Sequence, residues 1–259
     1  MFNLPELESA LAGTIFAGNL HFAPSTGSTN NDALAAARSG APHGSVFFAD
    51  EQTAGRGRGD HQWHSSPGDG LYVSVLLRPS LPMQRLLLLP LAAGLAAAQA
   101  IRSVSSLTVD LRWPNDLLLG PSKTGGILVE ANSEGGQVAY AVTGIGINVH
   151  QRQFPPNLDT PATSLDLAAD SAISRQALLI ALLESLQREA LALLHPDAAL
   201  AIPARVEQIS TWVRGRQVTV HGPQACAGVT AGLDDDGFLL VRTASGITRV
   251  QTGGLRAAS

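Results

Sequence analysis

The chain has 259 residues, of which 17 are Lys or Arg and 21 are Asp or Glu, so its formal net charge is -4; 45% of its residues are hydrophobic and 15% are charged. This balance supports a sizeable core and excludes extensive disorder, and the acidic net charge argues against a protein that coats nucleic acid. The single cysteine, Cys226, excludes an internal disulfide or a thiolate metal cluster. The start MFNLPELESA lacks the basic and apolar regions of a secretory signal, so we expect a cytoplasmic protein.

Residues 1–101 predict two helices and two strands. The stretch GSTNNDALAAARSGAP predicts a helix with Ser28 or Thr29 as N-cap, ended by Gly40 and Pro42. The apolar runs SVFFAD and LYVSVLL predict strands. Residues 86–101 are apolar, but they are fewer than the roughly 20 residues of a membrane span and include proline, glycine and glutamine, so they predict a buried helix and no membrane association.

The next segment mixes strand and helix patterns. TVDLRW, GILVEA and VAYAVTGIGINV are strand candidates, and PNDLLLGPSKTG between the first two is rich in turn residues. From Ser174 to His195 leucines recur at three and four residue spacing, which predicts an amphipathic helix ended by Pro196. These elements predict an α+β fold with a mixed sheet flanked by helices.

A second, smaller domain follows. Beyond Trp212 short strand patterns alternate with glycine and aspartate turns, as in GLDDDGFLLVRT, and this texture is typical of a small β-barrel. We therefore divide the chain into a main domain, residues 1–211, and a C-terminal domain, residues 212–259.

The stretch GRGRG invites a phosphate-binding interpretation. A dinucleotide fingerprint fails, because Gly55 and Gly57 are followed by Asp60 where a third glycine is needed, and GPSKTGG lacks the spacing of a Walker loop. What remains is a glycine loop that presents Arg56 and Arg58 either to the phosphate oxygens of a ligand or simply to solvent.

Three further segments supply polar groups. Ser28, Thr29 and Asn30 stand where a helix begins, and free backbone N–H groups there favour an anion. Asp116 follows a Trp-Pro-Asn turn, where it either closes the turn or holds a metal ion. Lys123 precedes a strand, and the glycines after it, including Gly126, allow close approach to the backbone.

Five motifs in order make a family resemblance specific. The series TGSTNNDA, EQTAGRGRG followed by a tryptophan, RWPNDLLL, KTGGILVE and GIGINV, from Ser28 to Asn148, resembles the biotin protein ligases. The resemblance implies a class II synthetase-like catalytic domain with a C-terminal SH3-like barrel. It implies an enzyme that activates biotin with ATP to biotinyl-5'-AMP, releasing pyrophosphate, and then biotinylates a lysine of the biotin carboxyl carrier protein of acetyl-CoA carboxylase. Biotin and ATP are then substrates, and Mg²⁺ is expected with ligands that the motifs do not identify.

The resemblance also implies site residues. It implies three catalytic residues: Lys123, Arg58 and Asp116. Lys123 would bind the biotin carboxylate, and Asp116 would serve the nucleotide and metal side or orient the acceptor lysine. The implied biotin-binding residues are Ser28, Thr29, Asn30, Gln52, Arg56, Gly57, Arg58, Lys123 and Gly126. The implied adenylate-binding residues are Arg56, Arg58, Trp63, Asp116 and Asn148.

The chain departs from the family pattern in two places. Where several family members have further basic residues in the loop, this chain has Gly59, Asp60, His61 and Gln62, so we expect weaker retention of the adenylate. His61 and His64 form an H-x-x-H pair, but we favour a loop role over a metal site. The residues before His21 are too few for a winged helix-turn-helix, so we expect neither DNA binding nor repressor activity.

Two alternative functions remain open. A lipoate–protein ligase shares the fold and the adenylation chemistry, and the GRGRG loop with the terminal barrel favours biotin. A regulator that binds biotin without catalysis is the second alternative, and the presence of Lys123 argues against it. Oligomeric state does not follow from the sequence.

Overall fold

The computed structural model describes residues 2–59, 61–79, 81–156 and 158–258, and this part of the chain contains two β-sheets. The larger sheet has seven strands in the order β1-β2-β3-β7-β6-β5-β4. β1 and β2 are parallel and the other neighbours are antiparallel, which confirms the prediction of a mixed sheet. The strands are β1 (Leu20–Thr26), β2 (Val46–Gln52), β3 (Gly70–Leu77), β4 (Asp110–Arg112), β5 (Asp116–Leu119), β6 (Ser122–Glu134) and β7 (Gln137–Asn148).

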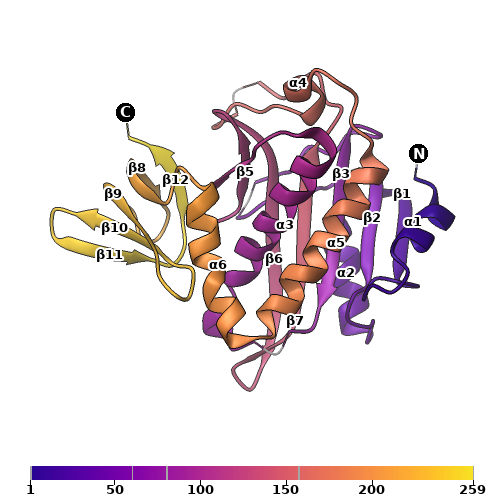
Figure 1. The fold of residues 1–259 in the computed structure, drawn as a ribbon, viewed down its shortest axis with the longest axis horizontal. Coiled ribbons are helices and arrows are strands. Elements are labelled where there is room, and N and C mark those ends of the chain that lie inside the picture. The colour runs from indigo at the N-terminus through magenta and orange to yellow at the C-terminus, as the bar shows by residue number, and fades with distance from the viewer. Residues whose placement is uncertain (1, 60, 80, 157, 259) are drawn as a thin grey trace.

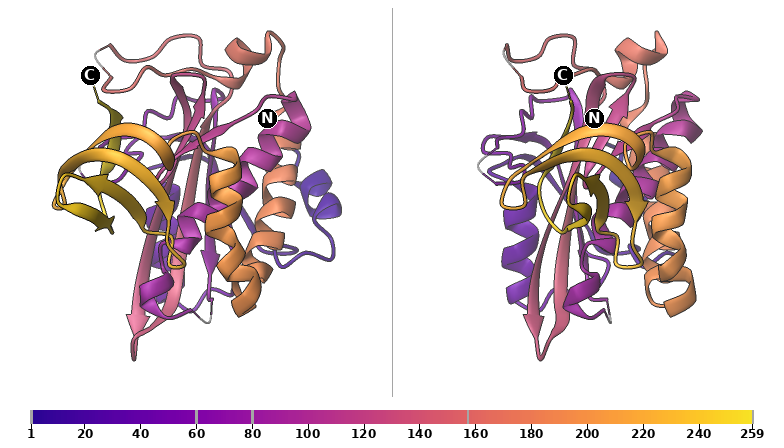
Figure 2. Two further views of the ribbon diagram at one scale, coloured as in Figure 1. Left: turned by 60° about the vertical axis from the view of Figure 1, so that its left-hand side comes forward. Right: turned by 90° about the vertical axis from the view of Figure 1, so that its left-hand side faces the viewer.

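Helices cover both faces of this sheet (Figure 1). α2 (Thr29–Arg38) packs on one face, and α3 (Leu88–Ser105), α5 (Arg175–Leu193) and α6 (Pro196–Ile209) form the layer on the other, as the views in Figure 2 show. The remaining helices are short: α1 (Leu4–Ala10), the 3₁₀ turn η1 (Met83–Arg85) and α4 (Leu165–Ala169). The larger domain is therefore a helix–sheet–helix sandwich.

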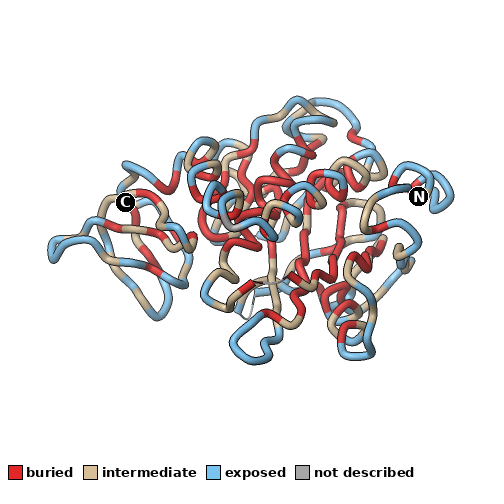
Figure 3. The backbone as a smooth tube through the Cα atoms, turned by 60° about the horizontal axis from the view of Figure 1, so that its bottom comes forward, coloured by how far each residue is buried: buried red, intermediate tan, exposed pale blue. Residues whose placement is uncertain are grey.

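α3 is the buried helix that the apolar stretch predicts. Every residue from Leu88 to Ala98 is buried, and the same helix forms part of the red interior in Figure 3. By length and composition the stretch Met83–Ser105 is one that could cross a membrane, with a mean hydropathy of 1.5, but 72% of its apolar window is buried inside the protein. Burial against α5 and the sheet accounts for its all-round apolar character.

Other elements were only partly predictable. α5 begins after Ser174, whose hydroxyl accepts a hydrogen bond from the Ala177 N–H, and it ends before Pro196 as predicted. A further helix, α6, then starts at Pro196, because proline fits the first turn of a helix as well as it ends the preceding one. The sequence patterns also missed β1 and β5, the latter lying within the turn-rich segment.

The second sheet has five antiparallel strands in the order β11-β10-β9-β8-β12, seen on the left of Figure 1. They are β8 (Arg214–His221), β9 (Cys226–Leu233), β10 (Leu239–Thr243), β11 (Gly246–Val250) and β12 (Gly254–Ala257). Val218, Val220 and Leu239 are fully buried, so one side of each strand faces a small core. This is a small barrel-like unit, as predicted; a boundary at residues 211/212, between α6 and β8, stays a prediction.

Candidate active site

A cavity of about 880 Å³ opens where β2 and β7 end, where β6 begins and where α2 starts. Its walls also include the loop after β2, the β4–β5 turn and segments of the five-stranded sheet. The structure brings all of the predicted site residues to this cavity: Ser28, Thr29, Asn30, Gln52, Arg56, Gly57, Arg58, Trp63, Asp116, Lys123, Gly126 and Asn148.

One end of the cavity is the N-terminus of α2. Ser28 is the N-cap residue by conformation, but its side chain does not cap the helix. Instead the Gln52 Oε1 accepts hydrogen bonds from the Thr29 N–H at 2.9 Å and the Thr29 hydroxyl at 3.0 Å. The Ser28 side chain is therefore not used in capping, and the helix start presents a polar surface to the cavity.

Beneath this end lies a buried polar network that the sequence motifs do not reveal. The hydroxyl of Ser74, on β3, lies 2.8 Å from the Thr29 hydroxyl and 2.6 Å from the Asn30 Oδ1. The Asn30 Nδ2 donates to the Glu130 carboxylate at 2.9 Å and approaches the Leu128 carbonyl at 3.4 Å. The hydrogen-bond partners thus determine the positions of both the Oδ1 and the Nδ2 of the Asn30 amide. A serine inside the apolar run LYVSVLL was the one available signal.

Glycines on β7 leave room for this network. A Cβ on Gly144 would lie 2.1 Å from the Asn30 Oδ1, and one on Gly146 would lie 2.6 Å from the Trp63 Nε1. The interruptions that glycine makes in this strand pattern therefore correspond to close approach by two side chains of the cavity.

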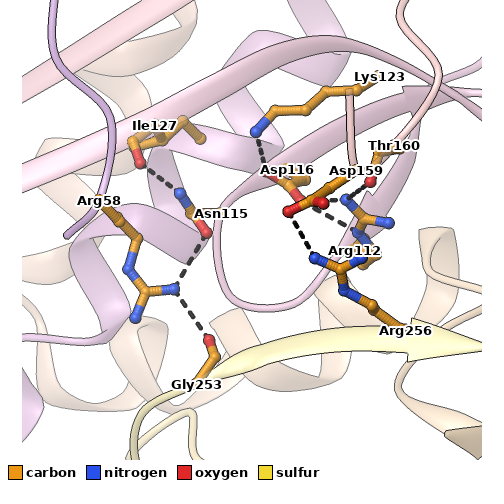
Figure 4. Close-up of polar contacts among 10 residues, drawn as sticks. All are labelled: Arg58, Arg112, Asn115, Asp116, Lys123, Ile127, Asp159, Thr160, Gly253 and Arg256. Carbon is orange, nitrogen blue, oxygen red and sulfur yellow. Dashed lines mark hydrogen bonds and ion pairs between the residues drawn. The ribbon is translucent and has the colours of Figure 1, made fainter. Parts of the chain in front are cut away.

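The other end of the cavity is a cluster of charges (Figure 4). The Asp116 carboxylate lies 2.5 Å from the Lys123 Nζ and accepts from Arg112 at 2.6 and 3.0 Å. Burial alone would raise the pKa of Asp116, but the Lys123 ammonium and the Arg112 guanidinium outweigh it, so the pKa lies below its ordinary value of 3.8. Arg112, which also donates to the Thr160 hydroxyl at 2.9 Å, was not predicted as a site residue.

The two loop arginines point to different partners. Arg56 forms an ion pair with Glu130 on β6. Arg58 donates to the Asn115 Oδ1 at 3.3 Å and to the Gly253 carbonyl at 3.0 Å, and so it connects the loop to the five-stranded sheet (Figure 4). Burial lowers the pKa of the Arg58 guanidinium, partly offset by the charge of Asp116.

The loop itself is closed by a backbone contact. The Gly57 N–H donates to the His61 carbonyl at 2.8 Å, and both residues border the cavity. Asp60, part of the departure from the family pattern, lies outside the described residues. The predicted effect of residues 59–61 on adenylate retention stays a prediction.

Trp63 lies over the floor of the cavity. Its ring centroid is 5.6 Å from the Lys123 Nζ, a cation–π geometry, and a Cβ on Gly126 would lie 3.4 Å from the ring. The Trp63 Nε1 is buried and has no hydrogen-bond partner within the described residues. A buried donor without a partner can be satisfied by a ligand in this cavity.

A loop from the end of β7 closes one side. The Asn148 Nδ2 donates to the Thr163 carbonyl at 3.0 Å, and Lys123 exchanges backbone hydrogen bonds with Pro161 and Thr163 at 2.7 and 3.0 Å. The same loop carries Asp159, which pairs with Arg256 of β12 at 2.6 Å. No individual residue of the C-terminal domain was predicted to border the site, because nothing in the sequence there marks a polar ligand.

The described residues do not form a dedicated metal site. No group of three or more His, Cys, Asp or Glu side chains among them could hold a metal ion. Asp116 is already engaged by two cations, and the His64 Nε2 is hydrogen-bonded to the Ser66 hydroxyl at 2.9 Å. Magnesium usually binds through one or two carboxylates together with substrate phosphates, so we assign no residue to Mg²⁺.

Comparison with known proteins agrees with the motifs. The model of the biotin/lipoate A/B protein ligase family matches residues 22–148. The bifunctional ligase/repressor BirA of Bacillus subtilis is 35% identical over 250 residues, which are 95% of this chain and 76% of that protein. The biotin--[acetyl-CoA-carboxylase] ligase of Mycobacterium tuberculosis is 35% identical over 219 residues, 83% of this chain and 79% of the relative.

A solved structure shares the fold over almost the whole length. The biotin protein ligase from Aquifex aeolicus in complex with biotin and ATP matches with a TM-score of 0.79 at 28% identity, covering 93% of this chain and 100% of the other. Together with the relatives above, this establishes that the chain belongs to the biotin protein ligases of the biotin/lipoate A/B protein ligase family.

Proposed function

We propose that this protein is an ATP-dependent biotin–protein ligase that forms biotinyl-5'-AMP and transfers the biotinyl group to a lysine of a biotin carboxyl carrier protein. The observation that carries the proposal is the polarity of the cavity. At the α2 end it has uncharged hydrogen-bonding groups, with the Arg56 cation there paired to Glu130, and at the other end it has Lys123, Arg112 and Arg58. Biotin has the same polarity, with a neutral ureido ring at one end and a carboxylate at the other.

The α2 end is assigned to the ureido ring. Ser28, Thr29, Asn30 and Gln52 offer hydroxyl and amide groups there, which suit a ring with two N–H donors and one carbonyl acceptor. The dithiolane of lipoate has no N–H or carbonyl group, so it would gain no hydrogen bonds from these polar side chains. The polarity of this end therefore favours biotin over lipoate.

The charged end is assigned to adenylation. A biotin carboxylate oxygen attacks the α-phosphorus of ATP, the bond from that phosphorus to the bridging oxygen breaks, and pyrophosphate leaves. Lys123 is suited to hold the carboxylate, with Arg56 and Arg58 from the loop neutralising charge on the phosphates. Gly57 allows the loop to close, and Gly126 allows the ligand to approach the backbone. Trp63 and Asn148 are assigned to the nucleotide.

Transfer then requires an amine at the same place. The lysine of the carrier attacks the acyl carbon, the bond from that carbon to the phosphate oxygen breaks, AMP leaves, and the amine loses its proton to solvent. Because two cations keep the pKa of Asp116 low, its carboxylate is a poor proton acceptor. We therefore assign Asp116 to orienting the incoming lysine and the nucleotide.

Further assignments rest on the family. We interpret the larger domain as class II synthetase-like and the five-stranded unit as an SH3-like barrel, with the boundary at residues 211/212. In the five-stranded unit, β8 to β11 form a meander and β12 returns beside β8, which is compatible with an SH3-like barrel. We place the reaction in the cytoplasm, where ATP and carrier are found, and we expect Mg²⁺ to arrive on the phosphates of ATP.

Mass spectrometry of the carrier domain tests the function. The protein is incubated with ATP, Mg²⁺, the carrier and either biotin or lipoate. A mass gain of one biotinyl group on the carrier is expected with biotin and none with lipoate. A lipoyl gain would support the alternative ligase, and biotin binding without any transfer would support the non-catalytic regulator.

A further inference from the structure

We propose that Glu130 is a positioning residue that sets both the Asn30 amide and the Arg56 guanidinium for ligand binding; this inference rests on the proposed function. Glu130 is on β6 and is not among the residues that line the cavity, whereas Asn30 and Arg56 both line it. Its carboxylate accepts from the Asn30 Nδ2 at 2.9 Å and pairs with Arg56. Glu130 therefore acts on the ligand only through these two side chains.

The first consequence concerns the direction of the Asn30 amide. Its Nδ2 faces the Glu130 carboxylate and the Leu128 carbonyl, two groups that only accept hydrogen bonds. The Asn30 Oδ1 accepts from Ser74 and keeps a second lone pair. Held in this way, Asn30 presents an acceptor rather than a donor, and so it selects a ligand N–H such as that of a ureido ring.

The second consequence concerns Arg56. A guanidinium on a glycine loop has many accessible rotamers, and fixing them on binding weakens affinity. The pair with Glu130 attaches Arg56 to a rigid strand at the edge of the cavity. The side chains are 38% and 28% exposed, and pairs of this exposure contribute little to folding stability. We therefore attribute the value of this pair to ligand binding rather than to stability.

Glu130→Gln is the direct test, because glutamine keeps the size but removes the charge and adds a donor that can face Asn30. We expect the Kd for biotin, measured by calorimetry without ATP, to rise about tenfold, the size of effect expected for a hydrogen bond to a charged group. KM for ATP should rise by less than the Kd for biotin does, because Arg56 is only one of the cations that we assign to the phosphates and Arg58 keeps its own contacts. The midpoint of thermal unfolding should stay within about 2 °C.

An analogue separates positioning from general damage. Biotin methylated on the ureido nitrogens cannot donate to the Asn30 Oδ1, so the wild-type protein should bind it much more weakly than biotin. In Glu130→Gln the ratio of the two affinities should fall about threefold or more, because Asn30 no longer presents a fixed acceptor. A purely structural role would weaken both ligands equally.

Glu207→Gln is the matched control. Glu207 likewise binds one arginine, Arg214, at 2.8 Å, and it also accepts from one backbone N–H, that of Leu233, at 2.7 Å, but neither it nor these partners line the cavity. This variant should bind biotin as the wild type does. In an Arg56→Gln background the cost of Glu130→Gln should shrink, because one of its two targets is gone.

The outcomes are distinct. Unchanged biotin affinity and unchanged analogue ratio in Glu130→Gln overturn the inference, as does a parallel loss of biotin affinity, ATP affinity and thermal stability. If Glu130→Gln does not fold, Glu130→Asp, which keeps the charge but shortens its reach, takes its place with the same expectations. Wild-type protein that does not bind biotin would overturn the proposed function instead.

Discussion

The Lys123 ammonium contacts the Asp116 carboxylate and the Trp63 ring, and replacing Lys123 tests the charged end of the cavity. Lys123→Gln removes the cation that pairs with Asp116 and that we assign to the biotin carboxylate. Without this ammonium, the negative charges of the biotin carboxylate and the ATP phosphates repel each other more strongly as they approach. We therefore expect the rate of adenylate formation to fall by about 100-fold or more, as when one charge-stabilising donor is lost. Biotin-dependent exchange of pyrophosphate into ATP measures this step. A normal exchange rate would show that the lysine serves another step.

Asp116 links the same cluster to pH. Because its pKa in the folded protein lies below the value of about 3.9 expected in an unfolded chain, its ionised form contributes stability at pH above about 4, and this is lost as the pH falls through the lower folded pKa. Asp116→Asn leaves two cations without their shared anion and should cost about 3 kcal/mol at neutral pH.

The test is urea unfolding of both proteins from pH 7 to pH 3. The difference in free energy of unfolding should be constant down to about pH 4 and should shrink below it, because wild-type Asp116 then becomes protonated as well. A difference that grows toward acid would contradict the assigned direction of the pKa.

At the scale of elements, the loop after β2 is held to the rest of the protein by Arg58. Arg58→Gly removes the contacts with Asn115 and Gly253 and restores full loop flexibility. Biotinyl-5'-AMP, a reactive mixed anhydride, is then less shielded from water, and we expect its release to be about tenfold faster, with unspecific biotinylation of added bystander proteins. Retention of labelled adenylate during rapid gel filtration measures release. Arg58→Lys, which keeps the charge without the planar guanidinium, should release the adenylate at an intermediate rate. Release from the glycine variant at the wild-type rate would show that Arg58 does not hold the loop closed over the adenylate.

Gly144 on β7 has no side chain, and this leaves room for Asn30 at the end of the site that we assign to the ureido ring. Gly144→Ala would place a Cβ 2.1 Å from the Asn30 Oδ1, so Asn30 must rotate away from Ser74. We expect biotin affinity to fall at least about tenfold, measured by calorimetry, because the acceptor is displaced. Gly27→Ala is the control, since its Cβ would meet open space, and it should bind biotin normally. Equal affinities would show that the strand can move.

The elements also show where sequence reasoning ends. The helix of residues 86–101 was predictable because an apolar run of that length has to be buried. β1 was missed because it is an edge strand, half exposed and interrupted by Pro24, so it lacks an alternating pattern. β5 was missed because its four residues pair with β4 through a tight turn that dominates the local sequence.

In the site, too, some residues could be predicted from the sequence and others could not. Motifs in the family order identified the twelve predicted residues that border the cavity, because each motif is a local stretch that can be read without the fold. Ser74 and Glu130 contact Asn30 from 44 and 100 residues away, and only the order β3-β7-β6 brings them beneath the helix start. A register between strands cannot be read from one strand at a time.

At the scale of the whole molecule, the five-stranded unit is joined to the larger domain by contacts of unequal depth. The pair of Arg256 and Asp159 is 48% and 63% exposed, whereas the Trp113 Nε1 donates to the Gly237 carbonyl at 3.0 Å in the interior. Exposed pairs contribute little to stability, while a buried group left without its partner costs about 1 to 3 kcal/mol. The buried contact should therefore contribute most to holding the five-stranded unit against the larger domain. It should also keep Gly253, which belongs to that unit, in place at the wall of the cavity.

Trp113→Phe tests this ranking, because phenylalanine keeps an aromatic ring but cannot donate to Gly237. We expect the free energy of unfolding to fall by about 2 kcal/mol, from the orphaned carbonyl and the lost ring volume. Amide hydrogen exchange should quicken at residues 234–238 and 252–254 before it does in α3, because the small unit loosens first. Arg256→Gln should leave the free energy of unfolding close to that of the wild type. If instead Arg256→Gln lowers the free energy of unfolding more than Trp113→Phe does, the exposed pair is the main attachment of the C-terminal unit, and the Trp113–Gly237 hydrogen bond is not.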